Sequence, residues 1–507
     1  MGETLSRGEG GTRRVSNRRT TQRPHSRSLL ILAALVMMLG PVLRAQPDRT
    51  APPVPGPPPA LRLPPIQHFV LSNGTKVVLM ERHGVPIVQI NLLVRAGTSM
   101  DPPEKGGLAS LTAAMLTEGA GSRGALEFAD AVDFLGAQIA VSARLYTSTI
   151  ALHTPLSKLD SGLALLTDLV RRPAFLPGEL ARVRNERLTA LLQSRDDPDI
   201  LASLTFKHAL YGEHPYGAPS AGTAASLAAM TVDDIRTFHA DYFVPSNTTI
   251  IVVGDITGGE IMPKLEISFG VWSGSAVSPP PVPPVPQKRE KTLLLVDKPG
   301  AAQSVIRIGR IGAPRLTDDY YAIIVMNALL GGPFTSRLNM NLREAHGYSY
   351  GASSEFDFLP LPGPFVAAAS VQTGVTDRAL TEFVNEFRGM LEPVPDAELE
   401  RVKNYLALGF PGEFQSVALI SSQLEELAIY GLPDGYFDEY LSRIRAVTKA
   451  DVERVARKYI DTGDLAFIVV GDRKEIGEPV RALNLAPVKF LTVDDVLGPA
   501  PALEGGK

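Results

Sequence analysis

The sequence predicts an α+β protein of two homologous domains, each a largely antiparallel sheet with helices packed on one face. Two observations favour this fold: a segment recurs at a constant offset, and short apolar strands mix with helices without regular βαβ alternation. Of the 507 residues, 44% are hydrophobic and 21% charged, as expected of a globular protein with more than one domain. We place the two domains at 66–273 and 291–480.

The first 45 residues have the three parts of a secretory signal. Six arginines between Arg13 and Arg27 precede an apolar run from Leu29 to Leu39, and Ala45 offers a small residue for cleavage. The run is shorter than the roughly 20 residues that a membrane-spanning helix needs. We therefore expect an exported protein, periplasmic or secreted, that meets a membrane only through 1–45. An uncleaved N-terminal anchor is the alternative.

Charge and cysteine content exclude several classes of partner and catalytic site. Residues 46–507 carry 42 Lys and Arg against 52 Asp and Glu, a formal charge of −10, with no basic stripe. Such a chain is a poor match for nucleic acid or an anionic membrane surface, and we expect no nucleic-acid partner. There is no cysteine, which excludes disulfides, cysteine nucleophiles and cysteine-based zinc sites. A metal ligand would have to be His, Asp or Glu.

Proline-rich stretches predict the connections between the domains. Residues 46–65 form a leader to the first domain, and 274–290, which contain Ser278–Pro286, form a stiff extended linker. Proline and glycine return after about residue 480, so we expect 481–507 to be a loosely held tail.

The repeat is clearest near the end of each domain. Thr231-Val-Asp-Asp-Ile235 recurs as Thr448-Lys-Ala-Asp-Val452, 217 residues later, and the Tyr and Val-Val-Gly-Asp that follow keep the same offset. Thr-x-x-Asp is a helix-capping pattern, and the apolar run before Gly-Asp predicts a strand. Each copy therefore contains a capped amphipathic helix that leads into a buried strand.

The first domain opens with strands and continues with helices. Residues 69–80 predict a hairpin that turns at Asn73-Gly74, and 86–95 predict another strand. Helices are then expected at 107–117, 125–136, 157–170 and 177–195.

Residues 70–119 resemble the opening of the pitrilysin/insulinase-type (M16), processing-peptidase-like metallopeptidases, and the resemblance covers nearly the whole chain after the signal. It implies a two-domain processing-peptidase/LuxS-like fold. In the family, a Gly-Leu-Ala-like entry leads to His-x-x-Glu-His on a helix. The two His bind zinc because residues four apart share a helix face, the Glu activates water, and a further Glu completes the site.

In this chain Gly107-Leu-Ala109 leads to other residues. The family's zinc and base positions fall on Ser110, Ala113 and Ala114, and the downstream Glu falls near Ala190. None of these side chains can bind zinc or act as a base at neutral pH, and we expect no metal in this chain. A shifted ligand at Glu186 is the alternative. The eight histidines include no His-x-His and no pair at helical i, i+4 spacing.

A second family feature lies in the C-terminal domain. There the family has an Arg at the end of a helix and a Tyr seven residues later, which contact the substrate carbonyl opposite the zinc. Arg343 and Tyr350 match this spacing, with Gly347 between them. Both side chains are hydrogen-bond donors suited to a peptide carbonyl. Tyr348 shares the expected strand face with Tyr350 and is distinguished only by register.

The resemblance implies a non-catalytic, substrate-contacting subunit of an exported two-subunit zinc metallopeptidase that acts on peptides or unfolded segments. Zinc is then expected in a paralogous partner subunit, with Arg343 and Tyr350 acting in trans. A structural or peptide-binding scaffold without a proteolytic role is the first alternative, and a relocated metal site is the second.

Overall fold

The computed structural model describes residues 61–276, 278–286 and 290–501, which lie within one compact unit, Pro59–Lys507. The predicted signal and most of the leader lie outside the described residues. Within the described part of the chain, no helix combines the length and apolar character needed to cross a bilayer.

The N-terminal half is built on a six-stranded sheet in the order β1-β2-β8-β3-β7-β6. All neighbouring strands are antiparallel except β2 and β8. The hairpin at Asn73-Gly74 and the strand predicted at 86–95 are both present. The strands are β1 (Gln67–Val70), β2 (Lys76–Glu81), β3 (Ile87–Val94), β6 (Gln138–Ala143), β7 (Ser148–Pro155) and β8 (Thr248–Gly254), with a separate pair β4 (Gly119–Ala120) and β5 (Arg123–Gly124).

Helices of the same half cover one face of this sheet. Their apolar side chains join inward-facing strand residues such as Leu79, Ile90 and Val252 in one core. All four predicted helices are present, with ends that differ by up to two residues. The helices are α2 (Leu108–Leu116), α3 (Ala125–Phe134), α4 (Leu159–Arg171), α5 (Pro177–Ser194), α6 (Pro198–Tyr211), α7 (Ala224–Ala229), α8 (Val232–Tyr242) and α9 (Gly258–Leu265).

The C-terminal half repeats this plan with a sheet in the order β11-β12-β10-β13-β9-β14. Strand β9 is parallel to both β13 and β14, and the other pairs are antiparallel. The strands are β9 (Thr292–Asp297), β10 (Gln303–Ile311), β11 (Ser349–Phe356), β12 (Pro364–Gln372), β13 (Ala466–Gly471) and β14 (Val488–Leu491). The helices are α10 (Tyr320–Leu330), α11 (Arg337–Asn339), α12 (Thr376–Gly389), α13 (Asp396–Gly409), α14 (Val417–Tyr430), α15 (Tyr436–Ala446), α16 (Lys449–Tyr459), α17 (Arg473–Ala482) and α18 (Val493–Leu497).

A loose tail is expected at 481–507, but its described part, 481–501, is tied to the rest of the fold. Strand β14 extends the sheet beyond β9, and Arg195 binds the carboxylate of Asp494 and donates to the carbonyl of Gly498 at 2.7 Å. The apolar Val488-Lys-Phe-Leu491 pairing with β9 outweighs the local proline and glycine content.

The repeat is present in three dimensions. Helices α8 and α16 both begin with a complete capping box, at Thr231 with Asp234 and at Thr448 with Asp451. Each helix leads into a central strand, β8 or β13, whose residues are all buried. Burial of every residue means that both faces of the strand are covered.

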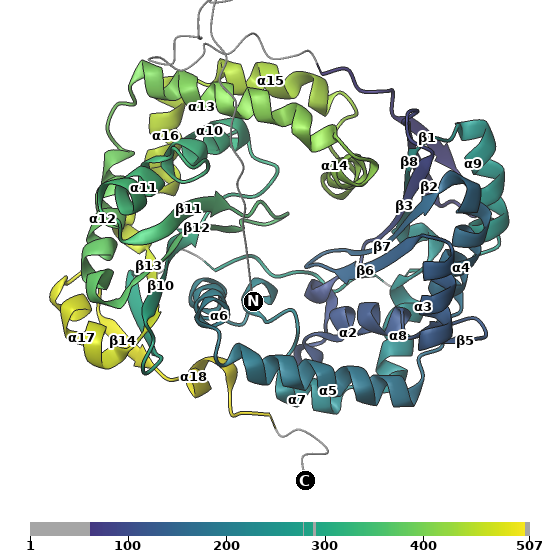
Figure 1. Cartoon of the computed structure of the whole chain (residues 1–507), viewed down its shortest axis with the longest axis horizontal. Coiled ribbons are helices and arrows are strands. Elements are labelled where there is room, and N and C mark those ends of the chain that lie inside the picture. The colour runs from purple at the N-terminus through teal and green to yellow at the C-terminus, as the bar shows by residue number, and fades with distance from the viewer. Residues whose placement is uncertain (1–60, 277, 287–289, 502–507) are drawn as a thin grey trace, which may run out of the picture. The chain divides into compact units, whose positions relative to one another are not determined.

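The second face of each sheet is covered by a helix from the other half. Helix α6 of the N-terminal half packs on β10 and β13, and α14 of the C-terminal half packs on β3 and β8 (Figure 1). In the core beneath α6, Leu201 and Phe206 pack with Ile468 of β13. In the core beneath α14, Ile420 and Leu424 pack with Ile251 and Val253 of β8. The halves are therefore interlocked rather than merely adjacent.

The described part of the predicted linker, 274–276 and 278–286, contains neither helix nor strand. His214 ties it to the N-terminal half, since its Nε2 donates to the Pro283 carbonyl at 2.8 Å and its Nδ1 accepts from the Tyr216 amide at 3.1 Å. Both ring nitrogens of this buried histidine thus have structural roles.

Candidate functional site

The residues at the family's metal positions lie on α2 and α5, and an arginine joins the two helices there. Arg187, one helical turn before Ala190, donates from Nη1 to Ser110 Oγ at 2.7 Å and from Nη2 to the Ser110 carbonyl at 2.6 Å. Ala113 is buried, Ala114 is partly buried and Ala190 is exposed. A guanidinium therefore occupies the contact between α2 and α5.

Asp101 completes this arrangement at the beginning of α2. Its carboxylate accepts from the backbone amides of Gly107 at 2.7 Å and Ala109 at 2.8 Å, which satisfies donors that a helix N-terminus leaves unpaired. Burial raises the pKa of Asp101 to about 6. The hydrogen bonds from these amides and the positive charge of Arg187 favour the ionised carboxylate and so limit the rise. Burial in turn lowers the pKa of Arg187. Gly107, at φ 91°, occupies the left-handed region and lies so close to Ala221 that a Cβ would meet its backbone at 2.8 Å.

These residues do not fit zinc. The site offers a hydroxyl, two methyl groups and a guanidinium, whereas zinc requires imidazole, carboxylate or thiolate donors. Glu186 does not replace them: its side chain is exposed and accepts from Arg182 Nη1 at 2.6 Å. Among the residues that the structure describes, no three His, Cys, Asp or Glu side chains gather into a group that could hold a metal ion.

The predicted substrate-contacting pair lies in the C-terminal half. Arg343 belongs to a π-helical turn, Met340–Ala345, and its guanidinium lies over the Phe334 ring at 4.0 Å, with Nη1 3.5 Å from Glu344. Tyr350, at the start of β11, is 90% exposed. No hydrogen bond, ion pair or ring contact joins Arg343 to Tyr350 in the described structure.

The structure separates the two tyrosines that sequence register alone distinguished. Tyr348 stacks on His346, with ring centroids 4.9 Å apart, and Arg378 lies 5.4 Å from its ring. Among the described residues, no aromatic ring or guanidinium lies against Tyr350 in this way. Gly347 makes the turn between the π-helical segment and β11 at φ 64°, a conformation that glycine adopts without steric cost.

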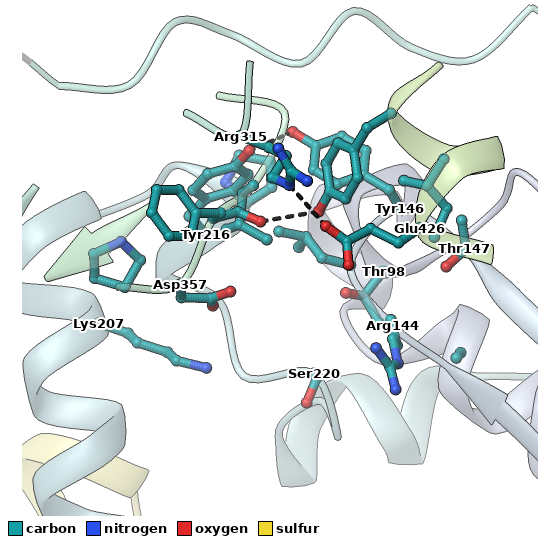
Figure 2. Close-up of a pocket in the computed structure, with 18 of the residues that line it drawn as sticks. Thr98, Arg144, Tyr146, Thr147, Lys207, Tyr216, Ser220, Arg315, Asp357 and Glu426 are labelled. Carbon is teal, nitrogen blue, oxygen red and sulfur yellow. Dashed lines mark hydrogen bonds and ion pairs between the residues drawn. The ribbon is translucent and has the colours of Figure 1, made fainter. Parts of the chain in front are cut away.

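Sequence reasoning missed a cavity of about 670 Å³ between the two halves (Figure 2). One wall contains a hydrogen bond of 2.7 Å between the hydroxyls of Tyr146 and Tyr216. Another contains buried Arg315, which donates to Glu426 at 2.7 Å and to the Tyr436 hydroxyl at 2.8 Å. The lining residues come from distant segments, so no local motif could have indicated it. Neither Arg343 nor Tyr350 lines this cavity.

Residues 76–224 match the family model described as insulinase (peptidase family M16), and residues 229–406 match the peptidase M16 inactive domain. Together the two models span most of both halves. The chain belongs to peptidase family M16.

The relatives agree with this assignment. A protein of Helicobacter pylori named non-peptidase homolog YmxG is 27% identical, over 79% of this chain and 92% of its own. A Bacillus subtilis protein named uncharacterized zinc protease YmxG is also 27% identical, over 80% and 98%. The solved peptidase M16 inactive domain from Pseudomonas fluorescens matches with a TM-score of 0.75 and 26% identity, over 80% and 98%.

Within the M16 family this chain is an inactive homologue. Its helix α2 has Ser110, Ala113 and Ala114 where the family's zinc and base residues are expected, and Arg187 binds the first of them. This agrees with a non-catalytic role.

Proposed function

We propose that this M16 homologue is the non-catalytic, substrate-contacting subunit of an exported two-subunit zinc metallopeptidase that acts on peptides or unfolded segments. Zinc belongs to a paralogous partner subunit, and Arg343 and Tyr350 contact the substrate carbonyl in trans. The observation that carries the proposal is the state of this pair: Tyr350 is 90% exposed, and Phe334 holds the Arg343 guanidinium from one side.

The chemistry supports this assignment. A guanidinium and a phenol donate hydrogen bonds without bringing a negative charge, so they suit an oxygen that becomes negative during peptide hydrolysis. Such groups stabilise charge but do not supply a nucleophile, and the residues at the family's zinc and base positions on α2 do not supply one either.

Export is part of the proposal. It is supported by the basic head, the apolar run from Leu29 to Leu39 and the small residue Ala45.

The test is reconstitution of peptidase activity. The chain without 1–45 is mixed with a zinc-bearing paralogue of the same source, and cleavage of an unfolded polypeptide is followed with and without chelator. We expect the mixture alone to cleave, and Arg343→Ala with Tyr350→Phe to lower kcat by about 100-fold, the effect of losing an oxyanion donor.

A matched control uses another exposed Arg and Tyr. Arg401→Ala with Tyr405→Phe changes a solvent-facing pair on α13 and should leave the mixture fully active. If the Arg343/Tyr350 double variant is equally active, the pair does not contact substrate. If complexes form but no mixture cleaves, the alternative of a scaffold without a proteolytic role replaces the proposal.

A further inference from the structure

A second cavity, of about 330 Å³, lies where the C-terminal segment crosses the N-terminal half. Its walls come from α5, α6, the segment that leads into α7, and residues 496–501 at and after the end of α18. Helix α18 packs on α6 (Figure 1). The volume is at the lower end of the range of about 300–1,000 Å³ that is typical of small-molecule sites.

The C-terminal segment that closes this cavity is held by polar and apolar contacts. Arg195, just after α5, donates to the Gly498 carbonyl at 2.7 Å and forms an ion pair with Asp494. Val496 and Leu497 pack against the core beneath α6. These contacts fix the wall that the segment supplies.

Most of the surface of this cavity is apolar. Leu191 of α5, Leu204 of α6, and Val496 and Leu497 of the C-terminal segment all line it and are only half-buried. Apolar side-chain surface therefore remains accessible to a ligand. Each methylene group that a ligand buries there is expected to tighten binding about fourfold.

One polar side chain that lines the cavity is free. His208, one helical turn after Leu204, makes no hydrogen bond, ion pair or ring contact with any residue that the structure describes. The other two polar side chains of the lining are engaged: Arg195 holds the C-terminal segment, and the Thr223 hydroxyl accepts from the Ser226 amide at 3.1 Å. An imidazole can donate or accept a hydrogen bond. The cavity thus combines an apolar surface with one available hydrogen-bonding group.

We propose that this cavity binds a small amphipathic molecule, a hydrocarbon body with one polar head group. The hydrocarbon lies against Leu191, Leu204, Val496 and Leu497, and His208 forms a hydrogen bond with the head group. Fatty acids and long-chain alcohols share this chemistry. A peptide does not fit, because its backbone would bring several donors and acceptors to a surface that can pair with one of them.

This inference goes beyond the proposed function and does not depend on it. The cavity needs no partner subunit and shares no residue with the Arg343 and Tyr350 pair. Binding is measured on the isolated chain, so a negative result leaves the reconstitution experiment untouched, and the reverse also holds.

The experiment is calorimetric titration of the isolated chain with octanoate and octan-1-ol, and with their shorter counterparts hexanoate and hexan-1-ol. We expect at least one of the longer molecules to bind. Its shorter counterpart should bind about 15-fold more weakly, because it buries two fewer methylene groups. The comparison of octanoate with octan-1-ol assigns the head group. Absence of binding by both at millimolar concentration would overturn the inference.

Variants locate the ligand. Ala225 lines the cavity at the start of α7 and is exposed, so Ala225→Trp should fill part of the space without unfolding the chain, and binding should be lost. Ala129→Trp, at an exposed position of α3 outside the cavity, is the matched control and should bind as the unmodified chain does. His208→Phe keeps an aromatic ring but cannot bond the head group, and should weaken binding about fivefold.

The circular dichroism of every variant is compared with that of the unmodified chain. Equal binding by the Ala225→Trp and Ala129→Trp chains would place the ligand elsewhere, and binding unchanged by His208→Phe would remove the hydrogen bond; either result contradicts the inference. The chain continues from Pro501, which lines the cavity, to Lys507. If octanoate and octan-1-ol bind only after Leu503→Ser, the cavity belongs to the chain's own end and the inference is wrong.

Discussion

Arg187 provides a fixed positive charge between α2 and α5, beside the carboxylate of Asp101. A metal ion would bring a positive charge to the same two helices, but α2 has no His, Cys, Asp or Glu to bind it. Unlike a metal, the guanidinium cannot dissociate, and it bonds Ser110 through both its side chain and its backbone. Its role here is to join the helices.

The first prediction is that Arg187→Met destabilises the fold by about 1–3 kcal/mol, because two charge-assisted hydrogen bonds to Ser110 are lost and Asp101 loses its nearby cation. Chemical denaturation measures the change. Arg401→Met, on the exposed face of α13, is the control and should fall within about 0.5 kcal/mol of the unmodified chain. Equal stability of the two variants would show that the Arg187 contacts contribute nothing.

The second prediction concerns Asp101 and pH. The folded protein raises its pKa from 3.8 to about 6, so between these values the folded state binds the proton more strongly than the unfolded state. Raising the pH through this window therefore destabilises the fold, by about 3 kcal/mol above pH 6, and this penalty is absent below pH 4. Asp101→Asn removes the penalty, so the stability of the unmodified chain relative to the variant should fall as pH rises.

The measurement compares the free energies of unfolding of the two proteins between pH 4 and 7. The difference is needed because buried His239 acts in the opposite direction: burial lowers its pKa to about 4, so its contribution to stability rises with pH. His239 is present in both proteins and cancels. Parallel pH profiles would contradict the assignment to Asp101.

At the scale of elements, the exchange of α6 and α14 explains how each sheet is covered on both faces. Burying a Leu or Phe side chain contributes about 1.5–3 kcal/mol. The contacts of Phe206 with the C-terminal sheet and of Leu424 with the N-terminal sheet therefore bind the halves strongly. A residue of one half should control the stability of strands in the other.

The third prediction is that Leu424→Ala, in the C-terminal half, loosens strands of the N-terminal half. Leu424 is 1% exposed, and its truncation should cost about 2–5 kcal/mol and speed amide hydrogen exchange in β3 and β8. Leu419→Ala, on the same helix but 41% exposed, should leave exchange unchanged. If amide hydrogen exchange became faster only in the C-terminal sheet, α14 would not be stabilising the N-terminal sheet, and the prediction would be wrong.

The sequence predicted much of this element by element. The constant offset of Thr231 and Thr448 revealed the repeat, and the capping pattern located the start of α8 and α16. The continuous apolar run of β8 also signals burial on both faces, but periodicity does not say which helix supplies the cover. That requires the packing of α14, which lies far along the chain.

Only part of the candidate site could be predicted from the sequence. The absence of zinc ligands is visible in the spacing of Ser110, Ala113 and Ala114, because a helix fixes which side chains share a face. The bond from Arg187 spans 77 residues and depends on how α2 and α5 cross. The cavity between the halves was not predictable at all, since three of the side chains that line it, Arg144, Lys207 and Asp357, come together only through the association of the halves.

At the scale of the whole molecule, the interlocked cores predict that the two halves of the folded protein stay associated without an intact linker. The fourth prediction uses a specific protease site placed in 278–286, where the described chain has no helix or strand. After cleavage, the two fragments should co-elute in size-exclusion chromatography and separate only in denaturant. Fragments that separate in native buffer would show that the shared cores are too weak to hold the halves together.

The interlocked cores also constrain how a duplicated protein of this kind can arise. A single repeat has one sheet face without its covering helix, because that helix belongs to the other copy. Two separate copies could satisfy each other only by exchanging α6-like helices, which is the arrangement of a domain-swapped homodimer. Joining the copies by a chain segment replaces a concentration-dependent association with an intramolecular one. In a joined chain each half always has the other's covering helix beside it, so the burial of both sheet faces does not depend on protein concentration.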